Sequence, residues 1–270
     1  MEIGVNVPNF GPGTDPGVLR EWARVVEGLG FDLLMVSDHV AITPDVAERY
    51  PEPFYEPFTT LSWLAGLTTR VRLGTTVLIL PYRHPLLVAR MAANLQQLSG
   101  GRFVLGVGVG WARQEFEALG VPFRERGRLT DAHLAALREA WRADAGGAGA
   151  VPVWVGGNSD AAIRRAARYG DAWHPLRVTL PWLRSAVERH APPAFAPRIS
   201  LRLTAAPVED ADRLAGTGTA EQIADDLDQL RRLGAGAVLL DPYHGDPEDT
   251  RRPHAAWQAL ATVAAQQKTG

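Results

Sequence analysis

Asp38 and His39 are the first residues along the chain whose types and position suggest chemistry. They follow residues 33–37, LLMVS, an apolar run that is predicted to form a buried strand. A histidine has an ordinary pKa of ~6.5, so it can give or take a proton at neutral pH. The pair would equally fit an exposed loop start without a role, and these two residues alone do not decide between the interpretations.

Glycines 106, 108 and 110 alternate at the end of another predicted strand, residues 103–107. Glycine removes the side chain where something must approach the backbone closely, so this strand end is a candidate ligand contact. The segment is not a dinucleotide fingerprint, because Trp111 stands where G-x-G-x-x-G requires its last glycine. A tight strand-to-helix turn without a ligand is the alternative.

A second turn, Gly156-Gly157-Asn158-Ser159, joins the short apolar run Val153–Val155 to a predicted helix. Backbone N–H groups at a helix N-terminus attract anions, so this turn is a candidate phosphate contact. The simpler interpretation is an ordinary N-cap, with Asn158 or Ser159 as the capping residue. A capping box is predicted at a later helix, formed by Thr219 and Gln222.

Metal chemistry has little local support in the sequence. The seven histidines show none of the spacings of zinc sites, and the chain has no cysteine. A site could still be assembled from strand ends that are distant in sequence, and the candidate ligands for a metal-dependent hydrolase would be Asp38, His39, His174 and Asp241.

Two further segments allow two interpretations each. Arg83 and His84 either bind substrate or cap the helix that follows them, and we favour capping. Loop 40–58 is long and rich in proline and aromatic residues, and loops of this length are usually functional. Its aromatic side chains would form either a lid over a ring-shaped ligand or a small core beneath the loop.

Eight short strands that alternate with helical patterns must position these residues. The strands are predicted at 3–8, 33–37, 71–78, 103–107, 153–155, 172–174, 199–205 and 237–240. Alternating strands and helices imply a parallel sheet, and eight units imply a (β/α)₈ TIM barrel, with an open doubly wound sheet as the alternative. The strand ends of a barrel open on one face, so the candidate residues are expected around a common rim. Segment 143–150, ADAGGAGA, is predicted to be a flexible linker.

Size and composition narrow the classes of function. A chain of 270 residues with 46% hydrophobic residues fits one domain over 1–270. A net charge of −2 provides no basic surface for nucleic acid. No apolar run reaches the ~18 residues of a membrane helix, and the N-terminus lacks the pattern of a signal peptide, so a cytoplasmic protein is expected.

Four segments, taken in order, resemble the bacterial luciferase-like superfamily. They are VSDH at 36–39, the block 70–111 that contains LSGGRF and LGVGVGW, followed by Glu115-Phe116, then 152–173, and 218–242 with its GTAEQIA motif. Within the superfamily the chain is most similar to the branch that uses the deazaflavin coenzyme F420. The resemblance implies a (β/α)₈ barrel that binds F420, or alternatively FMN. Members are often dimeric, so the resemblance favours a homodimer without fixing it.

The resemblance also implies roles for single residues. His39 would lie near the reactive carbon of the cofactor and act in proton transfer, and Asp38 would contact the deazaflavin head group. The other implied contacts are Thr76 and Val77 at a non-prolyl cis peptide behind the ring, Val109, Gly110 and Gln114 beside it, and Gly156, Gly157, Asn158 and Ser159 at the phosphate-bearing tail. Trp111 replaces an acid of the sugar-phosphate dehydrogenases in this branch, so oxidation of sugar phosphates is not expected.

The sequence therefore favours an oxidoreductase in which reduced F420 transfers hydride to an activated C=C or C=N bond of a small organic substrate. One alternative is an FMN-dependent monooxygenase of the same fold. The others are the metal-dependent barrel hydrolase and a cofactor-binding protein without catalysis. Sequence does not identify the substrate, because the loops that would select it vary most.

Overall fold

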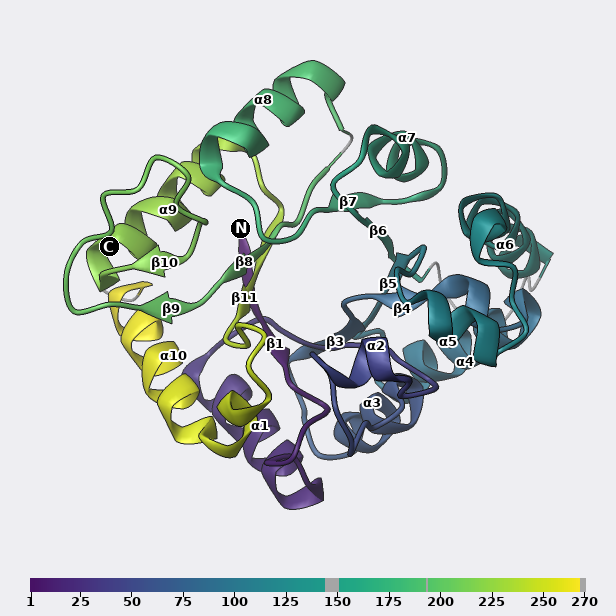
Figure 1. The fold of residues 1–270 in the computed structure, drawn as a ribbon, viewed down its shortest axis with the longest axis horizontal. Coiled ribbons are helices and arrows are strands. Elements are labelled where there is room, and N and C mark those ends of the chain that lie inside the picture. The colour runs from purple at the N-terminus through teal and green to yellow at the C-terminus, as the bar shows by residue number, and fades with distance from the viewer. Residues whose placement is uncertain (144–150, 193, 268–270) are drawn as a thin grey trace.

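A ring of parallel strands surrounded by helices forms the architecture (Figure 1). It is seen in a computed structural model that describes residues 1–143, 151–192 and 194–267. The strands are β1 (Glu2–Val7), β2 (Leu33–Val36), β3 (Arg72–Thr75), β4 (Leu78–Ile79), β5 (Phe103–Gly108), β6 (Val153–Gly156), β7 (Ala172–His174), β8 (Arg198–Ser200), β9 (Arg202–Leu203), β10 (Thr217–Gly218) and β11 (Ala237–Asp241).

Helices follow most strands and cover the outside of the ring (Figure 1). The α-helices are α1 (Pro16–Leu29), α2 (Pro44–Ala47), α3 (Pro57–Ala65), α4 (Pro85–Leu98), α5 (Arg113–Ala118), α6 (Arg126–Ala143), α7 (Asp160–Tyr169), α8 (Leu180–His190), α9 (Ala220–Leu233) and α10 (Pro253–Gln267). Short 3₁₀ helices are η1 (Leu80–Tyr82), η2 (Phe123–Glu125) and η3 (Pro247–Arg251). Over the described ranges, none of the helices combines the length and the apolar character that crossing a membrane requires.

The sheet closes on itself. Its strands pair in the order β7-β6-β5-β3-β2-β1-β11-β8, with β4 added beside β5. Parallel bridges from Trp173 to Phe195 and from Leu176 to Arg198 join the two ends of this order. The chain is therefore a TIM-like barrel of eight parallel strands, as predicted, and the open doubly wound sheet is wrong.

Two predicted strands are each divided in the structure. The strand expected over 71–78 stops at Thr75 and resumes at Leu78, and the intervening peptide Thr76-Val77 is cis, as the resemblance implies. The strand expected over 199–205 splits because residues 202–203 leave the barrel to pair with β10. The predicted linker 143–150 lies outside the described residues, apart from Ala143 at the end of α6.

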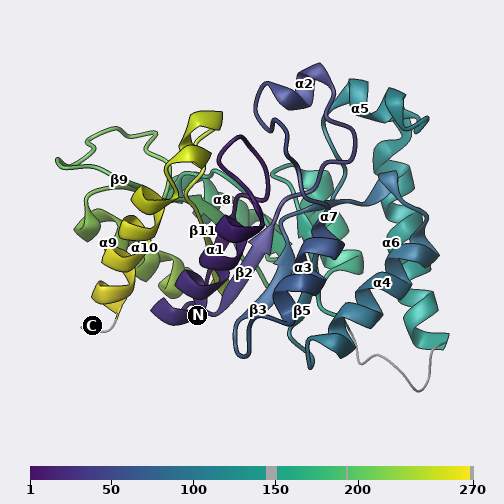
Figure 2. The ribbon, with the colours of Figure 1, turned by 90° about the horizontal axis from the view of Figure 1, so that it is seen from below.

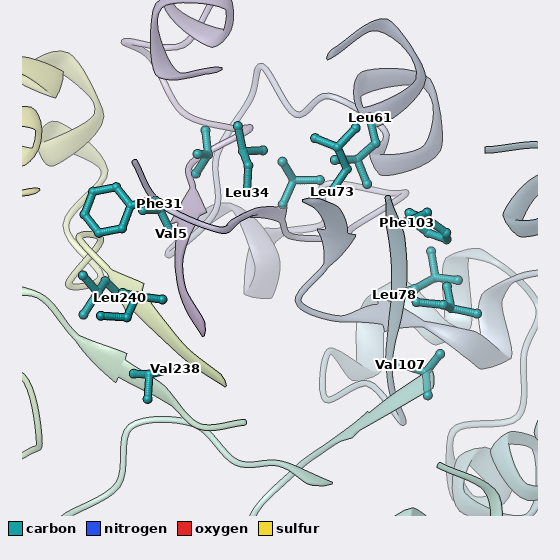
Figure 3. Packing of buried hydrophobic residues seen from close by; sticks show 14 of the residues in the cluster. Val5, Phe31, Leu34, Leu61, Leu73, Leu78, Phe103, Val107, Val238 and Leu240 are labelled. Carbon is teal, nitrogen blue, oxygen red and sulfur yellow. The ribbon is translucent and has the colours of Figure 1, made fainter. Parts of the chain in front are cut away.

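Alternation along the strands separates two apolar layers. Leu34 of β2 faces outward and belongs to the large cluster that includes Leu73 of β3 and Leu61 of α3 (Figure 3). Leu33 and Met35 face the other way and form a smaller cluster with residues of β5, β6 and β11. The inner cluster fills the barrel, as expected for a packed barrel rather than a pore.

Predicted caps fix the start of three helices. Ser159 caps α7 by accepting a hydrogen bond from the Ala162 N–H at 3.2 Å. Thr219 and Gln222 form the expected capping box on α9. His84 caps α4 through a bond from the Leu86 N–H at 3.3 Å. Each cap satisfies an N–H group that the helix itself leaves unpaired, and so sets where the preceding loop ends.

The glycines at the end of β5 make room for the protein's own chain. A Cβ on Gly106 would lie 2.0 Å from the carbonyl oxygen of Thr75. A Cβ on Gly108 or Gly156 would lie 2.5 or 2.9 Å from a methyl carbon of Val77. Gly106, Gly108 and Gly156 therefore admit Val77 and the end of β3, and Gly108, Gly110 and Gly156 also border the cavity described below.

We predict that Gly106→Ala destabilises the fold by about 1–3 kcal/mol, the usual cost of overpacking a closely packed core. The matched control is Gly28→Ala, on an exposed helical surface where an added Cβ meets nothing within 4 Å. That control should be neutral or stabilising by up to about 1 kcal/mol, since alanine favours helix over glycine. Denaturant unfolding measures both, and equal stability of the two variants would contradict the close contact.

Candidate active site

A cavity of about 250 Å³ opens at the C-terminal ends of the barrel strands. Figure 2 shows α2 and α5 at this same end of the barrel, opposite the N-terminus. Several of the predicted cofactor contacts line the cavity, namely Thr76, Val77, Val109, Gly110, Gly156 and Gly157. The rim predicted from strand ends is therefore present, at the face where barrel enzymes place their sites.

His39 lies in the cavity wall, enclosed by aromatic rings. Tyr50 stacks on the imidazole with ring centroids 5.2 Å apart. Phe54 and Trp111 meet it edge-on at 5.6 and 5.7 Å. The His39 side chain is only 4% exposed, so its ring is held in one orientation rather than free in solvent.

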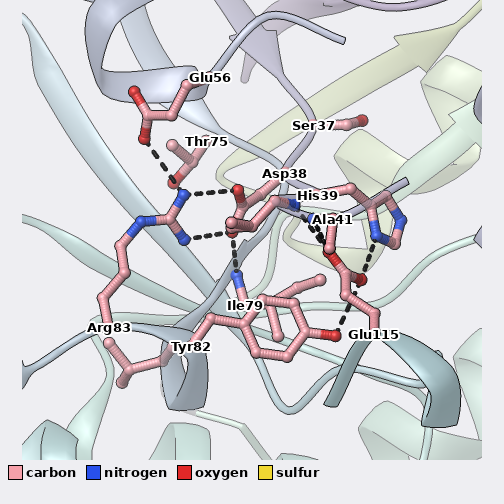
Figure 4. A network of polar contacts seen from close by, with 12 residues as sticks. Ser37, Asp38, His39, Ala41, Glu56, Thr75, Ile79, Tyr82, Arg83 and Glu115 are labelled. Carbon is pink, nitrogen blue, oxygen red and sulfur yellow. Dashed lines mark hydrogen bonds and ion pairs between the residues drawn. The ribbon is translucent and has the colours of Figure 1, made fainter. Parts of the chain in front are cut away.

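The imidazole is bonded to Glu115, a fully buried carboxylate on α5 (Figure 4). One carboxylate oxygen lies 2.6 Å from Nδ1 of His39 and accepts a second bond from the Tyr82 hydroxyl at 2.9 Å. The other accepts the Val40 and Ala41 N–H groups at 2.6 and 3.2 Å. Burial disfavours the ionised form, but the bonds from His39, Val40 and Tyr82 outweigh it and hold the pKa of Glu115 below its ordinary value.

Asp38 is adjacent to His39 but its carboxylate points into a different network. Arg83 binds both of its oxygens, at 2.7 and 2.8 Å, and the Ile79 N–H donates a third bond at 2.8 Å (Figure 4). Arg83 also pairs with Glu56 at 3.1 Å. Burial raises the pKa of Asp38 and Arg83 opposes that rise. Asp38 also lines the cavity, where the resemblance implies a cofactor contact.

A buried ion pair forms the floor of the cavity. Arg198 of β8 lines the cavity, and its Nε donates to the Asp241 carboxylate at 2.8 Å. Its Nη2 lies 2.7 Å from the same carboxylate oxygen, and its Nη1 donates to the carbonyl oxygen of Thr76 at 2.8 Å. Asn6 of β1 binds the second Asp241 oxygen at 2.9 Å. The floor therefore ties β1, β8 and β11 to the inward segment after β3.

His174 belongs to this floor as a neutral group. Burial, assisted by the nearby Arg198 charge, lowers its pKa to about 4. Its Nδ1 faces the carbonyl oxygen of Ala196, and its Nε2 lies 2.9 Å from the Thr76 hydroxyl. Nδ1 is thus the donor to the carbonyl, and Nε2 accepts from Thr76. Both ring nitrogens are occupied, so His174 serves the packing of the floor.

The four candidate metal ligands do not converge. Asp38 is bound by Arg83, His39 by Glu115, and His174 and Asp241 by separate partners in the floor. Within the described part of the chain, no cluster of three or more His, Cys, Asp or Glu residues could hold a metal ion. The geometry therefore lends no support to the hydrolase interpretation.

Three predicted cofactor contacts are not among the residues that line the cavity. Gln114 lies on α5, where its N–H donates to Asp45 at 3.2 Å. The Asn158 side chain is exposed and bonds the backbone of Leu176 twice, at 2.8 and 3.0 Å. Ser159 caps α7, as described above. In the same turn, the Gly157 N–H is bound by the His174 carbonyl at 3.3 Å.

The aromatic residues of loop 40–58 divide between the two predicted roles. Tyr50 lines the cavity and stacks on His39, which fits a lid. Phe54 stacks on Phe10 at 5.5 Å, and Phe58 packs with Phe103 at 6.0 Å in the main core. Only Tyr50 of these side chains borders the cavity.

Sequence reasoning missed Glu115, Tyr82 and Arg198. Glu115 was visible in the motif 111–116, where a carboxylate in the first turn of a helix follows the glycines. Tyr82 precedes Arg83 in the segment that breaks the chain after β4. Arg198 had a weaker signal, as a lone arginine beside the apolar start of a predicted strand. Arg83 was expected to cap a helix and instead binds Asp38.

The sequence is similar to a known protein family and to several of its characterised and uncharacterised relatives. Residues 1–213 match the profile of the luciferase-like monooxygenase family. The chain is 32% identical over 180 residues to an uncharacterized protein of Mycobacterium tuberculosis, a match that covers 56% of this chain and 62% of that protein. It is 33% identical over 188 residues to the phthiodiolone/phenolphthiodiolone dimycocerosates ketoreductase of the same organism, covering 57% and 49%. A 4-hydroxyprotoasukamycin monooxygenase of Streptomyces nodosus subsp. asukaensis is 36% identical over 125 residues, covering 44% and 31%. The chain thus spans less than two thirds of the length of each relative.

Solved structures share the fold at low identity. A monooxygenase of Streptomyces bottropensis has a TM-score of 0.75 at 18% identity, covering 99% of this chain and 100% of its own. An F420-dependent secondary alcohol dehydrogenase with an F420-acetone adduct has a TM-score of 0.72 at 17% identity, covering 97% and 98%. A type II Baeyer-Villiger monooxygenase of Pseudomonas putida in complex with FMN has a TM-score of 0.74 at 16% identity, covering 98% and 96%. The structural neighbours therefore include proteins of both cofactor types.

We predict that Arg83→Met costs about 3–5 kcal/mol of unfolding free energy, because it leaves the buried Asp38 carboxylate without its partner. Adding Asp38→Asn should restore part of the loss, since the amide is uncharged and its oxygen can still accept the Ile79 N–H. The control is Arg72→Met, which removes a partly exposed pair with Glu2 and should cost less than about 1 kcal/mol. If denaturant unfolding showed that Arg83→Met and Arg72→Met lose equal amounts of unfolding free energy, the ion pair of Arg83 with Asp38 would not contribute specially to the stability of the fold.

Proposed function

The chain belongs to the luciferase-like monooxygenase family, and we propose that within this family it is an F420-dependent oxidoreductase. The proposed reaction adds hydride from reduced F420, together with a proton, to an activated C=C or C=N bond of a small organic substrate. The observation that carries the proposal is the environment of His39, a buried imidazole at the cavity wall. Its Nδ1 contacts Glu115, and no group in the described ranges hydrogen-bonds its Nε2.

The residues around the cavity fit a flat heteroaromatic ring. Val77 offers an apolar surface on the inner side, while Tyr50 and Trp111 border the same space beside His39. Glycines at 108, 110, 156 and 157 present backbone without side chains. A mainly apolar cavity with few polar groups is typical of cofactor sites. The volume of this cavity, about 250 Å³, is slightly smaller than the ~300–1,000 Å³ of pockets that enclose a whole drug-sized ligand. It suits the ring, and Gly156 and Gly157 are the residues that would lie beside the tail.

Bound F420 would supply the hydride, since its ring carries carbon where a flavin has N5 and it does not readily activate O₂. The protein would supply the proton. His39 in its charged form donates from Nε2 to the substrate atom that has not received hydride, and becomes neutral. For a C=N bond, hydride adds to carbon and the proton to nitrogen, and His39 then regains a proton from water. The aromatic rings around His39 limit access of water to this transfer.

Relatives support both reduction and oxygenation. The mycobacterial ketoreductase supports a reductive enzyme, and the F420-dependent alcohol dehydrogenase supports the proposed cofactor for this fold. The Streptomyces monooxygenase at 36% identity supports the alternative, an FMN-dependent oxygenase. Because the family accommodates both, the cofactor decides between the two functions.

We predict that F420 binds the purified protein and that FMN binds at least tenfold more weakly. Titrating each cofactor while following its fluorescence measures the two dissociation constants directly. Tight binding of FMN with no binding of F420 would overturn the proposed cofactor and leave the monooxygenase. An inert protein of the same fold would bind F420 but show no F420H₂ oxidation with any activated alkene or imine.

We predict that His39→Ala lowers kcat for oxidation of F420H₂ about 10²–10⁴-fold, the usual contribution of a positioned acid or base, while F420 still binds. His254→Ala on α10, away from the cavity, is the control and should keep wild-type kcat. If His39→Ala turned over at the wild-type rate across the pH range, another group would deliver the proton.

A further inference from the structure

We propose that Glu115 is the positioning residue for His39. Its carboxylate holds the Nδ1 proton in place, so that Nε2 is the nitrogen that exchanges protons with the substrate. This inference rests on the proposed function for the identity of the reaction. The orientation of the imidazole and the choice of its protonated nitrogen follow from the contacts of Glu115 itself.

The surroundings of Glu115 require an ionised carboxylate. The Val40 and Ala41 N–H groups, at 2.6 and 3.2 Å, can only donate. Burial and the neighbouring Glu115 charge raise the pKa of Tyr82, so its hydroxyl at 2.9 Å keeps its proton and donates as well. These donated bonds, with the contact to His39, hold the pKa of Glu115 below its ordinary value despite its burial, so the carboxylate is ionised at neutral pH and can only accept. The fourth contact therefore places a proton on Nδ1 of His39.

The proton on Nδ1 assigns the role of the other ring nitrogen. No protein group in the described ranges hydrogen-bonds Nε2 of His39. When His39 is neutral, Nε2 carries a lone pair and can take a proton. When His39 is charged, Nε2 carries the proton that it can give. The carboxylate thus makes a single atom of the cavity wall both the acid and the base.

Other charged groups near the pair are already matched. The Asp38 carboxylate is bound at both oxygens by Arg83. Asp45 of α2 accepts the Thr43 hydroxyl at 2.6 Å and the Gln114 N–H at 3.2 Å. Neither contacts the His39 ring, so Glu115 is the carboxylate that sets its tautomer. Because Glu115 contacts Nδ1 of His39 as well as the Val40 N–H, its role is not limited to holding the start of the loop.

The test is Glu115→Gln, which keeps the size of the side chain. The Gln oxygen can still accept the Val40 and Ala41 N–H groups, but its NH₂ group donates toward Nδ1 and moves the His39 proton to Nε2. The ¹⁵N chemical shifts of the His39 ring, measured without cofactor at a pH where it is neutral, should show Nδ1–H in the wild type and Nε2–H in the variant. Tyr82→Phe keeps the charge of Glu115 and should retain the wild-type tautomer.

Turnover with F420H₂ provides the second measurement. Glu115→Gln should lower kcat about 10²-fold or more while changing KM little, since the wrong tautomer affects the proton rather than binding. Its pH–rate profile should differ from that of the wild type, because the variant lacks the carboxylate that contacts the imidazole. Glu117→Gln, an exposed position on the same helix, is the control.

The outcomes separate this inference from the proposed function. If Glu115→Gln keeps the Nδ1–H tautomer, or if its pH–rate profile and kcat match those of Glu117→Gln, the positioning role is wrong. The loss of activity in His39→Ala would then still support the proposed function. If no F420 activity exists at all, the tautomer measurement on the cofactor-free protein still decides the role of Glu115.

Discussion

The inward position of Val77, between the glycines that end β5 and β6, is the contact on which the mouth of the barrel depends. Because Gly108 and Gly156 admit its methyl groups, the chain after β3 steps into the barrel and β4 continues beside β5. That step delivers η1, and with it Tyr82 and Arg83, to the buried carboxylates of Glu115 and Asp38. The packing of Val77 therefore places Tyr82 beside Glu115 and Arg83 beside Asp38.

The buried charges at this end of the barrel are arranged in pairs, and the pairs differ in kind. Arg83 with Asp38 and Arg198 with Asp241 join permanent cations to carboxylates, so they hold strand ends together without exchanging protons. The pair of Glu115 with His39 joins a carboxylate to an imidazole, the side chain to which we assign the proton transfer. The proposed proton transfer thus involves a different carboxylate from those of the arginine pairs, although Asp38 and His39 are neighbours in sequence.

Sequence patterns predicted the parts of this structure that are local. Most strands and the helix caps depend on residues within a few positions of one another and were found where expected, whereas the strands predicted over 71–78 and 199–205 are divided. Partner choice is not local, since Glu115 reaches His39 across 76 residues and Arg83 reaches Asp38 across 45. The glycines were ambiguous for a related reason. Glycine records that a side chain must be absent, but not whether a ligand or Val77 takes the space.

Glu115 accepts hydrogen bonds from the first two amides of loop 40–58, so the start of that loop is held more firmly than the rest. Its beginning is bonded to the same carboxylate as the imidazole, so a change there would also disturb the contact between Glu115 and His39. The remainder, which carries Tyr50 at the cavity, lacks that bond and can change in length and composition. Residues beyond Ala41 can therefore vary with the substrate while the contact between Glu115 and His39 is kept.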